Sequence, residues 1–381
     1  MILIKNIKIY SPKYIGKKDI LLSGGKITCI DECIDFQSKN LKIIDGTGKI
    51  LIPGFIDQHV HITGGGGEGS FKTRVPEIML SKLTKAGITT VIGILGTDGT
   101  TRSVENLIAK TKGLKEEGIS AYAHTGSYEY PSITITGSVK RDIIFIDEII
   151  GVKIALSDHR SSSISTQELA RLASDARAAG MIGGKAGIVV VHIGDGELGF
   201  NKINELIKIS EVPIKTIRPT HINRNRKLFN EAIDFAMRGG IIDLTCGMHE
   251  ELSPRRAIKE AMKVGVPVEN MTVSSDGYGS WSRYDEFGNL VKIGVSSVNA
   301  IYEEFKAMVL EEKMDLELAL KFVTSNIAKA VNLYPKKGTI CSDADGDVIL
   351  LEEETLIINT VIANGKIMVE NGEAVILGTY E

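Results

Sequence analysis

Two histidines separated by a single residue have the spacing of a metal-binding pair. His59 and His61 end the apolar run Phe55–Val60, which its β-favouring residues predict as a buried strand. Because alternate residues of a strand point to the same face, both imidazoles would project together while Val60 packs on the other side. Two converging neutral imidazoles suit a Zn²⁺-type ion. Residues 64–67 are all glycine, so that loop can bring its backbone close to an ion or a substrate.

Four further polar residues lie within or at the end of other apolar runs. They are Lys153, His192, His221 and Asp276. A bare ammonium at Lys153 would be costly to desolvate, whereas carbamylation by CO₂ would turn it into a carboxylate-like group able to bridge two metals. Each residue also has an ordinary alternative: a solvent-facing lysine, a core or surface histidine, or an aspartate that caps a turn. The metal hypothesis therefore depends on whether the fold brings all these residues together.

The elements that would position these residues alternate between strands and helices. Eight apolar runs predict strands, at 55–60, 89–95, 120–123, 152–156, 187–192, 216–221, 241–245 and 271–275. Segments of helical periodicity separate them, for example 77–86, 103–117, 166–179, 226–238 and 254–264, with N-cap candidates at Ser103, Ser165 and Ser253. This alternation predicts a (β/α)₈ TIM-type barrel over residues 53–334, whose chemistry sits at the carboxyl ends of its strands.

The two ends of the chain have a different pattern. Residues 1–52 contain short strands and turns with no helical segment between them, and strand patterns return after Gly338, at 348–351, 360–363 and 374–377. We therefore expect residues 1–52 and 335–381 to build one small β-sandwich domain from both termini. Two further helices, predicted at 297–313 and 316–332, would close the barrel.

Composition excludes several classes of function. The 381-residue chain has a formal net charge of −3, which gives no electrostatic argument for nucleic acid or an anionic membrane surface. It contains no apolar run of about 18 residues that would predict a transmembrane helix. Its four cysteines, Cys29, Cys33, Cys246 and Cys341, form no Cys-x-x-Cys pair. They are interpreted as free thiols, which indicates a reducing cytoplasm.

The order of the six polar residues along the predicted strands resembles the amidohydrolase superfamily, specifically its members with two metal ions and a carbamylated lysine. The phrase at residues 53–61, Pro-Gly-Phe-Ile-Asp-Gln-His-Val-His, is similar to the most recognisable motif of that superfamily, and residues 324–329 and 338–345 resemble its C-terminal signatures. The resemblance implies that His59, His61 and Asp276 bind one metal and that His192 and His221 bind the second. Lys153, as N6-carboxylysine, would bridge both. Zn²⁺ is the default metal, although Fe²⁺, Co²⁺ or Mn²⁺ suits the same ligands.

A second set of residues resembles the isoaspartyl (β-aspartyl) dipeptidases within that superfamily. These residues are Glu68, Thr97, Tyr128, Arg160, Arg224 and Ser280. A β-aspartyl dipeptide carries one ammonium, which Glu68 can pair, and two carboxylates, which Arg160 and Arg224 can each hold through a bidentate fork. Ser280 and Thr97 can supply neutral hydrogen bonds. One acid and two arginines therefore match the charges of such a substrate.

The resemblance implies a metallo-dipeptidase in which a metal-bridging hydroxide attacks the isopeptide carbonyl. Asp276 would carry the proton to the leaving amine, and Tyr128 would stabilise the oxyanion. A cyclic-amide hydrolase of the dihydropyrimidinase or dihydroorotase type is the alternative, because it shares the metal ligands but has no need for Glu68 with two arginines. An inactive scaffold barrel is disfavoured because all six ligand positions are filled. The resemblance also suggests a homo-oligomer, such as an octamer.

Overall fold

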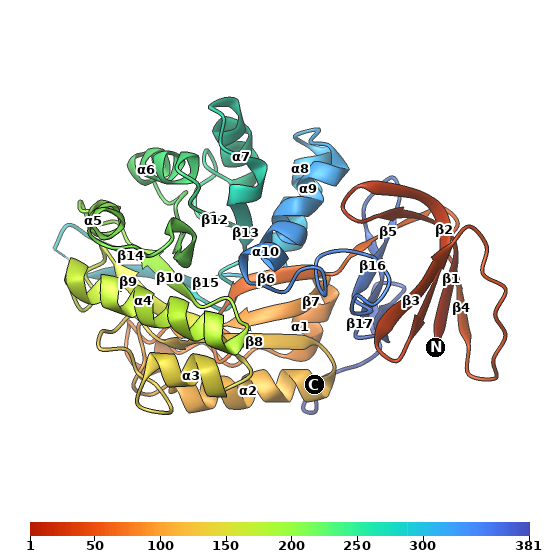
Figure 1. Cartoon of the computed structure of the whole chain (residues 1–381), viewed down its shortest axis with the longest axis horizontal. Coiled ribbons are helices and arrows are strands. Elements are labelled where there is room, and N and C mark those ends of the chain that lie inside the picture. Colours follow the sequence, from red (N-terminus) through yellow and green to blue (C-terminus); the bar gives the residue numbers. More distant parts are fainter. Residues whose placement is uncertain (288) are drawn as a thin grey trace.

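In the computed structural model, which describes residues 1–287 and 289–381, eight parallel strands form the central sheet (Figure 1). In chain order they are β6 (Phe55–Val60), β7 (Ile88–Gly93), β8 (Ser120–Gly126), β9 (Ile149–Leu156), β10 (Ile188–Ile193), β11 (Ile217–Thr220), β12 (Ile242–Thr245) and β13 (Met271–Ser274). Each strand pairs with its sequence neighbours, and a parallel bridge between Val60 and Gly277 brings the two ends of the sheet together. The predicted TIM-type barrel is confirmed, because each predicted run overlaps one of these strands.

Helices on the outside of the barrel connect successive strands. They are α1 (Leu80–Lys85), α2 (Val104–Glu117), α3 (Val139–Phe145), α4 (Thr166–Gly183), α5 (Asn201–Ile209), α6 (Arg226–Met237) and α7 (Pro254–Lys263). The side chain of Ser103 caps α2, and Ser165 forms a capping box with Glu168 at the start of α4. Ser253 occupies the N-cap position of α7, but its side chain makes no capping hydrogen bond.

The segment after the barrel strands differs in part from the prediction. Helix α8 (Ala300–Leu310) lies within the predicted 297–313, but the helix predicted at 316–332 is two helices, α9 (Leu316–Val323) and α10 (Ser325–Ala330). Thr324 breaks it, with φ −136° and ψ −90°. The break has a structural reason, because it places Asn326 where its amide donates to the carbonyls of Val268 (2.8 Å), in the turn before β13, and Met271 (2.9 Å), the first residue of β13.

Nine strands from both ends of the chain form a second sheet, seen at the right of Figure 1 as red and blue arrows. They are β1 (Ile2–Tyr10), β2 (Tyr14–Ser23), β3 (Lys26–Asp31), β4 (Lys42–Asp45), β5 (Lys49–Pro53), β16 (Val348–Glu352), β17 (Ile358–Ala363), β18 (Lys366–Glu370) and β19 (Glu373–Ala374). Strand β5 pairs antiparallel with β16 and so joins the two termini. The small β domain is confirmed, although β18 was not predicted and the strand expected at 374–377 ends at Ala374. The boundaries at residues 52 and 335 stay predictions.

Period-2 alternation gives this second sheet two cores. On β5, Ile50 and Ile52 join the apolar core of the barrel, whereas Leu51 between them packs with a separate cluster inside the terminal domain. Strand β16 divides in the same way, with Ile349 on the barrel side and Val348 on the other. The sheet is therefore fixed to the barrel by its own strand periodicity.

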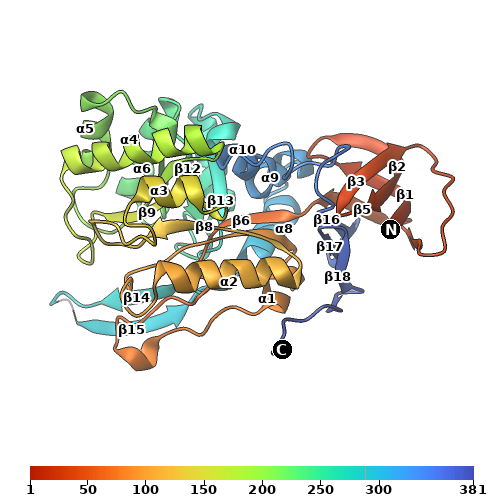
Figure 2. The ribbon, with the colours of Figure 1, turned by 60° about the horizontal axis from the view of Figure 1, so that its bottom comes forward.

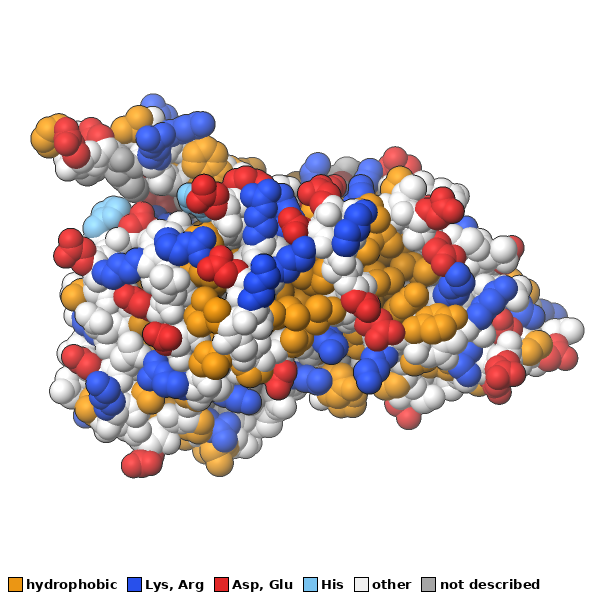
Figure 3. Space-filling view, turned by 90° about the horizontal axis from the view of Figure 1, so that it is seen from above, with side chains coloured by type: hydrophobic (Ala, Val, Ile, Leu, Met, Phe, Trp, Pro, Cys, Tyr) orange, Lys and Arg blue, Asp and Glu red, His pale blue; other side chains and the backbone are white. Residues whose placement is uncertain are grey.

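A hairpin that the sequence did not predict projects from the barrel. Its strands are β14 (Ser280–Tyr284) and β15 (Leu290–Val295), which pair with each other in a separate sheet. Figure 2 shows it as an arm at the lower left, and Figure 3 shows the same arm projecting at the upper left of a surface where Lys and Arg alternate with Asp and Glu. Because β14 begins four residues after Asp276, the hairpin stands beside the carboxyl ends of the barrel strands.

Candidate active site

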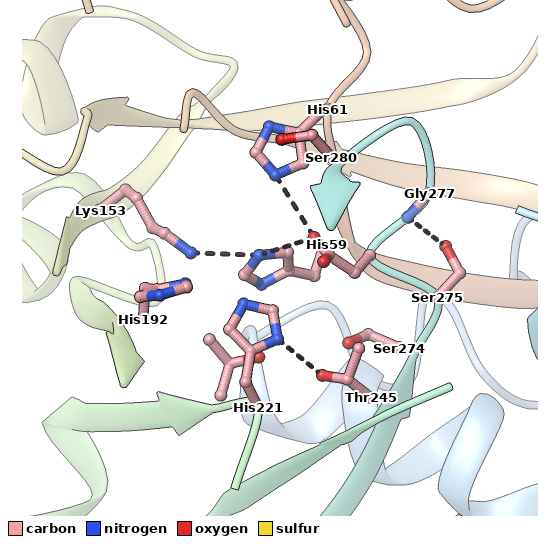
Figure 4. Close-up of polar contacts among 12 residues, drawn as sticks. His59, His61, Lys153, His192, His221, Thr245, Ser274, Ser275, Gly277 and Ser280 are labelled. Atoms are coloured by element: carbon pink, nitrogen blue, oxygen red, sulfur yellow. Dashed lines mark hydrogen bonds and ion pairs between the residues drawn. The ribbon is translucent and has the colours of Figure 1, made fainter. Parts of the chain in front are cut away.

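The six predicted metal ligands come together at the carboxyl ends of the barrel strands. His59 lies in β6, Lys153 in β9 and His192 in β10, while His61 and His221 directly follow β6 and β11, and Asp276 is the second residue after β13. All six side chains are buried, and Lys153 has no exposed surface. Figure 4 shows the labelled histidines and the lysine pointing toward one another. The barrel therefore supplies the common location that the sequence could only suggest.

Distances among these side chains fit a metal-binding group. Asp276 Oδ1 lies 3.3 Å from His61 Nε2 and 3.6 Å from His59 Nε2, and Lys153 Nζ lies 3.1 Å from His59 Nε2. His59, His221 and Asp276 each offer a ligand atom, and these atoms lie within 4.8 Å of one another. Asp276 Oδ1 is buried and has no hydrogen-bond partner among the described residues. An imidazole and carboxylate set with an unsatisfied buried oxygen suits a divalent cation such as Zn²⁺.

Burial sets the protonation states that metal binding needs. Desolvation lowers the pKa of His59, His192 and His221 well below the ordinary value, so their imidazoles are neutral. Desolvation also lowers the pKa of Lys153 to about 7, although the charge of Asp276 acts in the opposite direction. A large fraction of Lys153 is therefore a free amine near neutral pH, which is the form that reacts with CO₂.

His221 and His192 differ in how their rings are held. His221 Nδ1 lies 2.9 Å from Thr245 Oγ1, which fixes the ring and leaves Nε2 available. His192 Nδ1 lies 2.6 Å from Tyr128 Oη, and its Nε2 lies 2.9 Å from Asp158 Oδ2. Both nitrogens of His192 thus already have partners, so a metal at His192 would have to replace one of these contacts.

An open cavity of about 530 Å³ leads from these residues to the surface. Glu68 lies on its wall and accepts hydrogen bonds from Ser280 Oγ (3.0 Å), Arg160 Nη1 (3.2 Å) and Thr97 Oγ1 (3.4 Å). Tyr128 and Arg224 line the same cavity. All six predicted substrate-binding residues therefore line one cavity, which also reaches the metal-binding group.

Asp158 is a component of the site that sequence reasoning missed. Its carboxylate accepts a bidentate fork from Arg160, with Nε–Oδ1 at 2.9 Å and Nη2–Oδ2 at 2.7 Å, in addition to its contact with His192. Burial opposes ionisation of Asp158, but the hydrogen bonds from Arg160 and His192 outweigh it and hold its pKa well below the usual range. The available signal was its place as the second residue after β9, two residues before Arg160. Arg160 is therefore tied to Asp158 and Glu68, with Nη1 alone directed to Glu68.

Tyr128 keeps its proton and Arg224 has only a weak partner, so both are available to a substrate. Burial raises the pKa of Tyr128, so its phenol stays protonated and can donate a hydrogen bond. Arg224 Nε lies 3.2 Å from Asp195 Oδ1, and Asp195 is 76% exposed. An exposed ion pair is weak, so Arg224 can exchange this partner for a carboxylate that enters the cavity.

The fold and site define a barrel hydrolase of the metal-dependent kind. A model of the amidohydrolase family matches residues 50–368, and the chain belongs to that family. Beyond the family, the chain is similar over its whole length to beta-aspartyl dipeptidase from the thermophilic, keratin-degrading Fervidobacterium islandicum AW-1, solved in complex with the beta-Asp-Leu dipeptide. The two are 45% identical, with a TM-score of 0.92 and 98% of each chain covered. A second structure of a dipeptidase of that organism is 43% identical, with a TM-score of 0.89 and the same coverage.

Other relatives are more distant. D-hydantoinase (dihydropyrimidinase) from Thermus sp. is 19% identical with a TM-score of 0.67, covering 98% of this chain and 96% of that one, which shows the shared fold alone. Dihydroorotase of Staphylococcus epidermidis is 32% identical over 134 residues, which cover 35% of this chain. The match spans only 30% of that dihydroorotase, so it says little about the whole protein. None of the described helices is long and apolar enough to cross a membrane.

Proposed function

We propose that this protein is a metal-dependent dipeptidase that hydrolyses the isopeptide bond of β-aspartyl dipeptides. The observation that carries the proposal is the placement of Glu68, Arg160 and Arg224 on one cavity wall beside the histidine and aspartate group. One acid and two arginines match one ammonium and two carboxylates. The similarity at 45% identity to a protein solved with beta-Asp-Leu supports the same substrate class.

Two divalent cations, Zn²⁺ by default, would be held by the six clustered residues. His59, His61 and Asp276 would hold one, His192 and His221 the other, and carbamylated Lys153 both. When bound, such ions supply a water activated near neutral pH and polarise the scissile carbonyl. The lowered pKa of Lys153, about 7, leaves a large fraction of it as the free amine and supports its role as N6-carboxylysine.

The chain's own residues then position the substrate and move its protons. Asp276 has a free carboxylate oxygen with which to accept the proton of the attacking water, and it would deliver that proton to the leaving amine. Tyr128 would turn its phenolic hydrogen from His192 to the carbonyl oxygen as that oxygen becomes anionic. The products are aspartate and the second amino acid.

Binding of the substrate would rearrange the cavity wall. Glu68 would exchange part of its contact with Arg160 or Ser280 for the substrate ammonium. Arg224 would leave exposed Asp195 for a substrate carboxylate. Arg160 keeps its fork to Asp158, so it would bind the other carboxylate through Nη1, which now contacts Glu68.

The test is hydrolysis of β-Asp-Leu beside α-Asp-Leu, dihydrouracil and dihydroorotate, with metal content measured on the same sample. Cleavage of β-Asp-Leu alone by protein with about two metals per chain is the expected result. Ring opening of dihydrouracil or dihydroorotate without peptide cleavage would instead favour the cyclic-amide alternative, which the partial similarity to dihydroorotase keeps in view. Metal-loaded protein that cleaves none of the four compounds would contradict both functions.

The location of the protein in the cell and its oligomeric state are also proposals. We infer a cytoplasmic protein, because Cys29, Cys33, Cys246 and Cys341 are free thiols. We also infer a homo-oligomer, on the resemblance alone; sedimentation at several protein concentrations would measure its size.

A further inference from the structure

A second cavity, of about 460 Å³, lies at the opposite rim of the barrel from the active site. We call it the basal cavity. Three segments build it: the end of α4 with the following loop (177–188), the 213–218 segment around the 3₁₀ turn Ile214–Thr216, and residues 329–332 at the end of α10. Because these residues precede or begin β10 and β11, the cavity opens at the amino ends of the strands.

The charge of this cavity is one-sided. Its lining includes five basic residues, Arg177, Lys185, Lys215, Arg218 and Lys329, and no acidic residue from the described chain. None of the five forms an ion pair within 4.0 Å of a described carboxylate, although the charges of Asp147 and Glu148 act on Lys185. The neutral donors Thr216 and Asn332 complete the polar lining. In a protein with a net charge of −3, five cations without an ion pair around one cavity create a local field for an anion.

Arg218 is a buried arginine of the cavity lining that has an unused hydrogen-bond donor. It lies in β11 with only 9% of its surface exposed, and its Nε has no hydrogen-bond partner among the described residues. Its Nη1 donates to the carbonyl of Lys215 and its Nη2 to that of Ala330 (3.0 Å). Burial lowers the pKa of Arg218 to about 9, so it remains charged at neutral pH. A buried cation that lacks an acid is costly, and an anion in the cavity would offset that cost.

Capping of helix ends explains only part of the basic lining. Arg218 binds the carbonyl of Ala330 at the end of α10, and Lys185 Nζ binds the carbonyls of Ile143 and Ile146 at the end of α3. Arg177, Lys215 and Lys329 cap no helix end within the described chain, although Lys329 Nζ lies 5.0 Å from the centre of the Tyr334 ring. These three cations have no anionic partner among the described residues.

The walls of the basal cavity are held by close packing. A Cβ on Gly180 would lie 2.5 Å from the Cα of Gly187, so α4 can approach this loop only with glycine there. Asn332 Nδ2 donates to the carbonyl of Gly184 at 3.2 Å, which ties the end of α10 to the end of α4. The cavity is therefore framed by fixed backbone, and its size lies within the ~300–1,000 Å³ range of small-molecule sites.

We propose that the basal cavity binds a small molecule with two phosphate groups. Two phosphate monoesters carry about −3 to −4 charges at neutral pH, which complements five cations better than a single carboxylate does. Buried Arg218 would donate its free Nε to one phosphate, and exposed Lys215 and Lys329 would pair with the other. This inference is independent of the proposed dipeptidase activity.

The test is calorimetric titration of the metal-loaded enzyme with fructose 1,6-bisphosphate as probe and fructose as uncharged control, at constant ionic strength. The bisphosphate should bind and fructose should not. The double variant Lys215→Glu/Lys329→Glu should weaken binding at least tenfold, because it reverses two exposed charges of the lining. The matched control Lys39→Glu changes an exposed lysine of the terminal domain and should bind as the unchanged protein does.

Each contrary result overturns the proposal. Absence of bisphosphate binding would do so directly. Equal binding by the double variant would place the anion elsewhere, for instance at the active-site metals. Binding of RNA oligonucleotides but not the bisphosphate would assign the cavity to a different partner. Should the double variant not fold, as judged by its melting temperature, Arg177→Glu reverses another exposed charge of the lining and is held to the same expectation.

Discussion

At the scale of single residues, Asp276 combines two tasks. Its Oδ1 faces His61 and His59, and that oxygen has no donor within the described chain, so it is free both to bind a cation and to accept a proton. Asn has the same shape but does not accept a proton. We expect Asp276→Asn to lower kcat for β-Asp-Leu by about 10²–10⁴-fold with most of the metal retained.

Steady-state kinetics and metal analysis of the same preparation measure both effects. Glu286→Gln is the matched control, because this exposed residue lines the same cavity and loses the same charge. It should leave kcat within about twofold of the unchanged enzyme. Turnover by Asp276→Asn that equals the control would remove the proton-transfer role.

Lys153 makes metal loading depend on pH and CO₂. Its pKa of about 7, against an ordinary 10.5, means that the neutral amine becomes the main form as pH rises through 7. We expect metal-free protein supplied with Zn²⁺ and bicarbonate to regain activity faster at pH 8 than at pH 6. Lys153→Met should not regain activity at either pH. Reactivation that is equally fast without CO₂ would speak against the carbamate.

At the scale of elements, β9 is anchored at its start by Glu148 and carries Lys153 further along. Glu148 is almost fully buried and accepts hydrogen bonds from Lys112 Nζ (3.0 Å) and Lys115 Nζ (2.7 Å) of α2. Burial alone would raise its pKa, but the hydrogen bonds from the two lysines outweigh it and lower the pKa to about 2. The contact links a barrel strand to its covering helix.

A carboxyl whose pKa is lower in the folded than in the unfolded state stabilises the fold above its unfolded pKa, near 4.5. That contribution is lost as pH falls from about 4.5 toward 2. Because both lysines are about half exposed, we expect Glu148→Gln to lower the free energy of unfolding at pH 7 by only about 1–2 kcal/mol. The difference should shrink below pH 4.5. Urea denaturation across this range measures it, and Glu116→Gln, an exposed change on α2, should show no such trend.

At the scale of the whole molecule, Lys337 joins the terminal sheet to the barrel. It is 2% exposed, and its ammonium contacts Asp345 (2.8 Å), Asp347 and Ser120 Oγ, the last at the start of β8. Burial opposes its charge, but the two aspartates outweigh burial and raise its pKa. Lys26 Nζ also pairs with Asp345 at 2.6 Å, so two lysines and two aspartates balance their charges at the junction of the two domains.

Lys337→Met would leave the buried carboxylate of Asp347 without a cation, whereas half-buried Asp345 would keep Lys26. We expect a loss of about 3–5 kcal/mol in the free energy of unfolding, as is typical when one member of a buried ion pair is removed. The measurement is urea denaturation at pH 7 with Lys336→Met as control, because Lys336 is its exposed neighbour. A loss no larger than that of the control would mean that the domains are held by apolar packing alone.

Strand and helix patterns in the sequence were sufficient to predict the barrel, the joining of both termini in one β domain, and the residues that stand at strand ends. Local chemistry determines these, because apolar runs of fixed period form strands and the residue after such a run lies at the rim. The break at Thr324 and the β14–β15 hairpin were missed. The break depends on contacts of Asn326 with residues more than fifty positions away.

Only the tertiary structure decided how the side chains pair. It tied Arg160 to Asp158, placed His192 between Tyr128 and Asp158, and gathered five cations at the far rim. It also set the ionisation of Lys153, because complete burial is what lowers the pKa of this lysine to about 7. The physical reason is the same throughout: desolvation and hydrogen-bond geometry depend on distances between distant segments, and residue type and spacing along the chain do not contain those distances.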